Sequence, residues 1–188
     1  MMWTVPNVLT MARLVAAPGV VLAFVVFDRP VADHLALWLF LSAAVTDFFD
    51  GWLARRLGQI SPIGTMLDPI ADKAMVVTAL AALLGLYGFD WMLAVPVALI
   101  LLREVLVSGI REYLGEVKLA VTVLAKWKTA AQMGAIGLLL AVEPVFAGDW
   151  VAEAIGLGLL WIAAVLTTIT GWDYAAKALR YIREREEQ

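Results

Sequence analysis

Long apolar runs recur along this sequence of 188 residues, and they constrain its fold more than any other feature. The sequence is 63% hydrophobic and 16% charged, with a mean hydropathy of +0.87, whereas soluble domains are about half apolar. A helix needs about 20 mostly apolar residues to cross a bilayer. The runs therefore predict an all-α membrane protein and a single membrane domain over residues 1–188. The six transmembrane helices are expected at about 8–27, 34–56, 65–87, 91–113, 126–143 and 150–174.

The basic residues are distributed unevenly between the two expected sides of the membrane. Of the 14 Lys and Arg residues, only Arg29 falls in a loop on one side, and acidic residues dominate there. Because cytoplasmic loops are enriched in Lys and Arg, both termini are expected in the cytoplasm of a bacterial-type inner membrane. The N-terminal residues do not resemble a cleaved signal peptide. The absence of cysteine excludes disulfides and thiolate metal sites.

Four aspartates lie close together in this otherwise apolar sequence. Asp47 and Asp50 are three residues apart, and Asp68 and Asp72 are four apart, so each pair shares one helical face. Burying four carboxylates is costly unless a cation lies among them. Oxygen ligands favour Mg²⁺ or Mn²⁺ over Zn²⁺. The alternative is a structural ion-pair network between these aspartates and nearby basic residues, namely Arg55, Arg56 and Lys73.

The aspartates belong to a longer pattern, Asp47-x-x-Asp50-Gly51-x-x-Ala54-Arg55, then eight residues, then Gly64-x-x-x-Asp68-x-x-x-Asp72. This pattern resembles the signature of the CDP-alcohol phosphotransferase family at every position. The resemblance implies the six-helix fold of that family, two divalent cations and a homodimer. It implies that Asp47, Asp50, Asp68 and Asp72 hold metal and that Asp72 is also the general base. It further implies that Asp47, Gly51, Ala54, Arg55, Gly64 and Asp68 line the CDP site.

Three further segments narrow the resemblance. They are 6–14, 103–112 and 126–133, and they look like those of the phosphatidylglycerophosphate synthase branch of the family. That branch transfers the phosphatidyl group of CDP-diacylglycerol to sn-glycerol 3-phosphate and releases CMP. Other members use phosphatidylglycerol, inositol phosphate or serine as acceptor, and these alternatives stay open.

The basic residues of the fourth and fifth expected spans support a phosphorylated acceptor. Arg103 and Arg111 are eight residues apart on one helical face, which puts Arg103 roughly 12 Å deeper in the membrane. A deeply placed Arg by default marks a functional site. Together with Lys126 and Lys128, these residues are candidates for binding the acceptor phosphate. The alternatives are pairing of Arg103 with Glu104 or a motif aspartate, and lipid-headgroup contact for the others.

Two alternatives of other kinds are a cation transporter and a non-catalytic membrane scaffold, although a scaffold would not need the signature residues intact. Buried carboxylates also occur in cation transporters, but there they lie near the bilayer midplane, often with internal repeats. No repeat is evident here, and the aspartates fall at the ends of the expected spans. Asn7 and Thr10 are expected either to cap the first helix or to contact the nucleotide.

Overall fold

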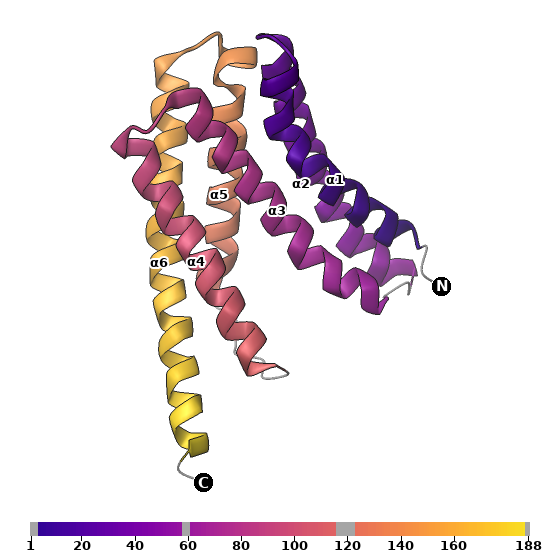
Figure 1. Cartoon of the computed structure of the whole chain (residues 1–188), viewed down its shortest axis with the longest axis vertical. Coiled ribbons are helices and arrows are strands. Elements are labelled where there is room, and N and C mark those ends of the chain that lie inside the picture. Colours follow the sequence, from indigo (N-terminus) through magenta and orange to yellow (C-terminus); the bar gives the residue numbers. More distant parts are fainter. Residues whose placement is uncertain (1–3, 58–60, 116–122, 187–188) are drawn as a thin grey trace. The chain divides into compact units, whose positions relative to one another are not determined.

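A computed structural model describes residues 4–57, 61–115 and 123–186 of the protein. The described residues form helices and no strands, which confirms the all-α prediction. The six helices, labelled in Figure 1, are α1 (Val5–Val26), α2 (Val31–Leu57), α3 (Pro62–Tyr87), α4 (Trp91–Leu114), α5 (Val123–Phe146) and α6 (Trp150–Glu186). Within the described ranges, all of these except α2 are long and apolar enough to cross a membrane. A crossing by α2 stays a prediction.

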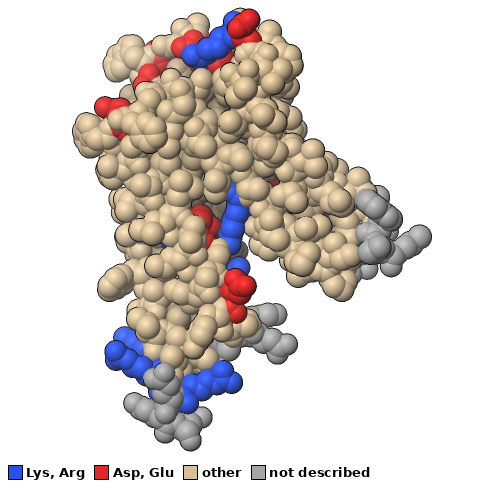
Figure 2. Space-filling model, in the orientation of Figure 1, with Lys and Arg blue, Asp and Glu red and all other residues tan. Residues whose placement is uncertain are grey.

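The surface of the helices suits contact with lipid. Large apolar side chains are exposed along several of them, including Trp38, Val105 and Trp172. In the space-filling view, residues other than Lys, Arg, Asp and Glu cover most of the visible surface, while Lys and Arg gather at the C-terminal end of α6 (Figure 2). An apolar exterior of this extent is stable only in a hydrocarbon environment. With five membrane-spanning candidates, the chain is a multi-pass membrane protein.

Local sequence signals explain where the helices begin and end. Ser61 caps α3 by accepting a hydrogen bond from the Gly64 amide, and Pro62 opens the helix where no donor is needed. Gly88 and Gly115 end α3 and α4 with positive φ angles of 79° and 60°. The helix α6 continues to Glu186, past the expected span that ends at about residue 174.

The chain divides into two compact units, and each is described by itself. The first unit comprises Met1–Gly88 and Ile136–Ala154, in which α1 packs against α2 and α3. The second unit comprises Phe89–Ala135 and Ile155–Gln188. In the second unit the indole Nε1 of Trp161 on α6 donates a hydrogen bond of 2.9 Å to the Met92 carbonyl on α4. The same ring packs edge-on against Trp91, with centroids 6.2 Å apart.

An ion pair supports the turn between α1 and α2. The guanidinium Nε of Arg29 donates to the Asp33 carboxylate at 2.8 Å, and the Asp33 side chain is buried. The hydrogen bond to Asp33 holds the pKa of Arg29 above its ordinary value. Arg29 is the one basic residue expected on its side of the membrane. Its positive charge is therefore balanced by the carboxylate of Asp33 within the turn.

Candidate active site

The N-terminal half of α1 carries a polar face in an otherwise apolar helix. Asn7, Thr10 and Arg13 recur at intervals of three residues and are only 2%, 1% and 4% exposed. Such spacing places all three side chains on one side of the helix. The helix cap is provided by a different residue, Thr4, whose hydroxyl accepts from the Asn7 amide at 3.4 Å. The polar face of α1 is therefore available to α2 and α3, the helices on which it packs.

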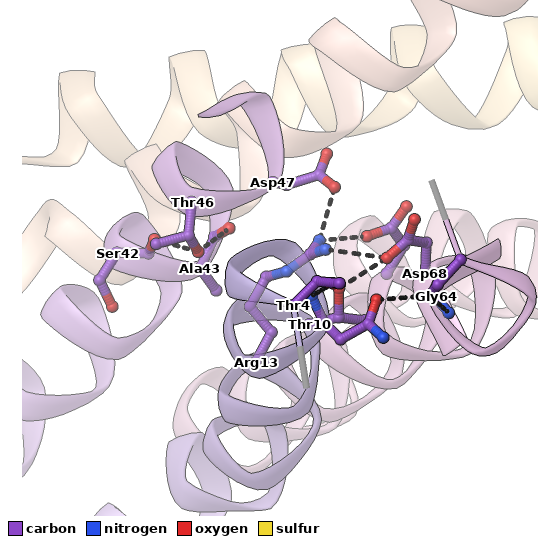
Figure 3. Close-up of polar contacts among 12 residues, drawn as sticks. Thr4, Thr10, Arg13, Ser42, Ala43, Thr46, Asp47, Gly64 and Asp68 are labelled. Atoms are coloured by element: carbon purple, nitrogen blue, oxygen red, sulfur yellow. Dashed lines mark hydrogen bonds and ion pairs between the residues drawn. The ribbon is translucent and has the colours of Figure 1, made fainter. Parts of the chain in front are cut away.

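The guanidinium of Arg13 lies among three aspartates from the two neighbouring helices. Its Nη1 donates to Asp47 on α2 at 2.5 Å and to Asp72 on α3 at 2.7 Å. Its Nη2 lies 3.7 Å from Asp68, also on α3. Figure 3 shows Arg13 reaching from α1 into this acidic cluster. One buried cation on α1 thus joins a carboxylate of α2 to two carboxylates of α3.

Two more contacts attach α1 to the start of α3. The hydroxyl of Thr10 donates to Asp68 at 2.7 Å, and the Ser61 hydroxyl donates to the Asn7 amide oxygen at 2.8 Å. Gly64 permits this approach, because a Cβ atom there would lie 2.6 Å from the Asn7 oxygen. A larger residue at position 64 would push α1 away from α3.

In the part of the chain that the structure describes, acidic groups outnumber basic ones in this cluster. Three carboxylates lie around one guanidinium, and their side chains are 51%, 49% and 50% exposed for Asp47, Asp68 and Asp72. They therefore have oxygen atoms open to a further ligand. Hard divalent cations bind oxygen donors of this kind. No group of three acidic, His or Cys side chains in the described ranges already forms a metal cage, and the Asp50 side chain lies outside them.

The second unit holds a cluster of opposite composition. One oxygen of the Glu104 carboxylate accepts from Arg103 Nη1 at 3.0 Å and from Lys128 Nζ at 2.7 Å. The three side chains are 15%, 17% and 8% exposed, in that order. Among the described residues, two largely buried cations therefore share one carboxylate. Such a cluster suits an anionic ligand.

Comparison with known proteins agrees with this chemistry. The family profile described as CDP-alcohol phosphatidyltransferase matches residues 3–169, which is most of the chain. The chain belongs to this family. Curated relatives named CDP-diacylglycerol–glycerol-3-phosphate 3-phosphatidyltransferase include proteins of Cereibacter sphaeroides, Rickettsia bellii and Pectobacterium atrosepticum. They are 49%, 44% and 39% identical to this chain, and the matches cover 99%, 94% and 93% of it. The same matches cover 100%, 96% and 94% of the relatives.

The structure brings together three of the four aspartates of the CDP-alcohol phosphatidyltransferase signature. Asp47, Asp68 and Asp72 all contact or approach Arg13. The backbone of the remaining α2 positions is helical, but their side chains lie outside the described residues; these positions are Asp50, Gly51, Ala54 and Arg55. Gly64 is buried against Asn7. A Cβ atom at this position would therefore meet a side chain of α1.

The basic residues expected at the acceptor site of this family member fall into three groups. Arg103 and Lys128 meet at Glu104, which confirms the alternative that Arg103 pairs with its neighbour. Arg111 is exposed in the last turn of α4. The Lys126 side chain lies outside the described residues. The structure thus joins two of the four candidates through a carboxylate.

The polar face of α1 was not assigned to the active site of this family from the sequence. Asn7 and Thr10 were expected to cap α1 or to contact nucleotide, and the capping alternative is wrong because Thr4 is the cap. Arg13 was not expected to pair with the aspartates. The ion-pair network considered as an alternative involved Arg55, Arg56 and Lys73 instead. A signal was present in the sequence, because three polar residues at helical spacing inside an apolar span would face lipid only at a cost in free energy. Which helix they would face does not follow from spacing.

Proposed function

We propose that this protein transfers the phosphatidyl group of CDP-diacylglycerol to sn-glycerol 3-phosphate, with release of CMP. The names of relatives that are 39–49% identical over nearly the whole chain support this reaction. The observation that carries the choice of acceptor is that Arg103 and Lys128 lie together at Glu104. An acceptor with its own phosphate offers these two cations an anionic ligand, whereas serine or a neutral polyol does not.

Asp47, Asp50, Asp68 and Asp72 would hold two divalent cations, Mg²⁺ or Mn²⁺. The half-exposed carboxylates fit such ligands. When bound, the cations would neutralise the pyrophosphate and stabilise the attacking and leaving oxygens. Arg13 and Thr10 would hold the aspartates in place from the side of α1.

Asp72 would act as the general base. Its carboxylate would take the proton of the acceptor hydroxyl as that oxygen forms a bond to the β-phosphorus. The bond between the β-phosphorus and the bridging oxygen breaks, and CMP leaves with the electron pair. Positioning supplies much of the rate in such transfers. The family pattern supports CDP binding by Asp47, Gly51, Ala54, Arg55, Gly64 and Asp68.

Arg103, Arg111, Lys126 and Lys128 would bind the phosphate of glycerol 3-phosphate. The test supplies purified protein with CDP-dioleoylglycerol and one acceptor at a time, and measures CMP release. Glycerol 3-phosphate should support turnover, while glycerol, serine, inositol phosphate and phosphatidylglycerol should support little. Comparable turnover with any of these other acceptors would contradict the proposed substrate.

The variant Arg111→Ala sharpens this test. It should raise the KM for glycerol 3-phosphate by roughly 10- to 100-fold, the effect of losing one charge-assisted contact. The KM for CDP-diacylglycerol should change little. Arg180→Ala, on the exposed tail of α6, is the matched control and should leave both values unchanged. A defect confined to CDP-diacylglycerol would move Arg111 to the nucleotide or lipid site.

We place the protein in the inner membrane as a homodimer, with the single domain 1–188 and both termini in the cytoplasm. The uneven distribution of Lys and Arg supports this orientation. Single cysteines at Asp90 or Asp149, both exposed, should react with an impermeant thiol reagent on intact cells, and one at Gln188 should not. The reverse pattern would invert the topology.

A further inference from the structure

The basic cluster of the second unit depends on a glycine in a different helix. A Cβ atom at Gly171 on α6 would lie 2.8 Å from Cγ of Arg103 on α4. That distance is below any normal contact, and Cγ is too near the backbone to move aside easily. Gly171 and Arg103 also line one cavity of about 230 Å³ between α4 and α6. The course of the Arg103 side chain is therefore set by the missing side chain of Gly171.

Glu104 fixes the position of the guanidinium end of the Arg103 side chain. Arg103 Nη1 and Lys128 Nζ lie at 3.0 and 2.7 Å from the same carboxylate oxygen. The two cations cannot then be farther apart than the sum of these distances. The Nε of Arg103 is buried and makes no hydrogen bond within the described part of the chain. Arg103 thus keeps donor capacity after pairing with Glu104.

We propose that Glu104 and Gly171 are positioning residues that hold Arg103 and Lys128 side by side as ligands for the acceptor phosphate. Glu104 offers one shared acceptor that opposes the repulsion between the two cations. Gly171 leaves the space through which Arg103 reaches that acceptor. A phosphate monoester has several terminal oxygens, so it bridges two neighbouring cations. This proposal rests on the proposed function for the identity of the acceptor.

The main experiment compares Gly171→Ala with Gly158→Ala. Both glycines lie in α6, but a Cβ atom at Gly158 would meet nothing within 4 Å. Because Ala favours helices over Gly, neither change weakens α6 by itself. Gly171→Ala should raise the KM for glycerol 3-phosphate by about 10-fold or more, with little change in the KM for CDP-diacylglycerol. Gly158→Ala should match wild type, and equal behaviour of the two variants would overturn the proposal.

A double-mutant cycle separates positioning from general packing. In an Arg103→Ala background no Cγ atom stands in the way, so Gly171→Ala should change the KM for glycerol 3-phosphate by less than about 2-fold. An equal increase in both backgrounds would show that Gly171 acts without Arg103. Glu104→Gln should also raise this KM, because the two cations then repel each other. Glu184→Gln on the exposed tail is its control. A lower KM in Glu104→Gln would mean that Glu104 competes with the phosphate.

A readout without turnover keeps this proposal distinct from the proposed function. Inorganic phosphate should raise the thermal midpoint of the detergent-solubilised wild type more than chloride does at equal ionic strength. The increase should shrink in Gly171→Ala and persist in Gly158→Ala. If wild type shows this pattern but does not use glycerol 3-phosphate, the acceptor assignment is wrong and the positioning stands. If wild type turns over and Gly171→Ala keeps the full phosphate effect, the positioning is wrong.

Discussion

The two polar clusters of this protein are built in opposite ways. In the first unit, three aspartates surround one buried arginine, and the carboxylates are half exposed. In the second unit, an arginine and a lysine surround one glutamate, and all three side chains are largely buried. Counting only the described residues, each cluster contains a single residue of the minority charge. Acidic groups are thus in the majority in one cluster and basic groups in the other, and each suits a ligand of opposite sign.

The difference indicates a division of work between the two clusters. Carboxylates suit divalent cations and the proton transfer from an acceptor hydroxyl. Ammonium and guanidinium groups suit a phosphate. The exposure differs accordingly: the half-exposed carboxylates have free oxygens, whereas the buried cations are held by Glu104. If this division is correct, metal and phosphate should stabilise the protein independently of each other.

The largest effect is expected from Asp68→Asn, which keeps the shape of a metal ligand and removes its charge. CMP release should fall by about 10³-fold or more, because several kcal/mol of charge stabilisation depend on the metal site. Stabilisation by Mn²⁺ in thermal unfolding should be lost, while stabilisation by inorganic phosphate should remain. Asp28→Asn, in the exposed turn before α2, is the matched control. Loss of the phosphate effect as well would show that the two clusters are not independent.

A somewhat smaller effect is expected from Asp72→Asn. Removing a general base typically costs about 10²–10⁴-fold in turnover. The KM for glycerol 3-phosphate should stay near the wild-type value, because the basic cluster is unchanged. Single-turnover measurement of CMP release at saturating substrates checks this expectation. Near-normal turnover would exclude Asp72 as the base and assign the acidic cluster to metal binding alone.

The sequence predicted the acidic cluster better than the basic one. Spacing alone placed Asp68 and Asp72 on one face of α3, and the short connection to α2 brought Asp47 near them. Those relations are local, so helical geometry determines them. The contact of Arg13 with Asp72 joins residues 59 positions apart. Helical periodicity gives the face of α1 that is polar and leaves open which helix covers it.

The basic cluster contains a second feature that could not be predicted from the sequence. Arg103, Lys128 and the possible pairing with Glu104 follow from charge and position along the chain. The space left by Gly171 does not, because a glycine in an apolar span has many packing uses. The distance from a Cβ atom at position 171 to Arg103 Cγ distinguishes Gly171 from Gly158, which is exposed in the same helix. Tertiary packing therefore decides which small residues matter for a site.

The smallest effect is expected from Arg13→Ala. Whether added Mn²⁺ stabilises this variant more or less than wild type tests most directly how the acidic cluster works. Each charged hydrogen bond contributes about 1.5–3 kcal/mol, and the half-exposed carboxylates lower this figure because water screens them. In the presence of EDTA, the variant should unfold at a lower temperature than wild type, since three carboxylates lose their internal cation. Added Mn²⁺ should then stabilise Arg13→Ala more than it stabilises wild type, because the metal also relieves their repulsion. Arg13→Lys keeps the positive charge, so its unfolding temperature and its stabilisation by Mn²⁺ should lie between those of wild type and Arg13→Ala. If Mn²⁺ instead stabilised Arg13→Ala less than wild type, the main role of the guanidinium would be to orient the aspartates for metal binding. Its charge would then not be a substitute for the charge of the metal.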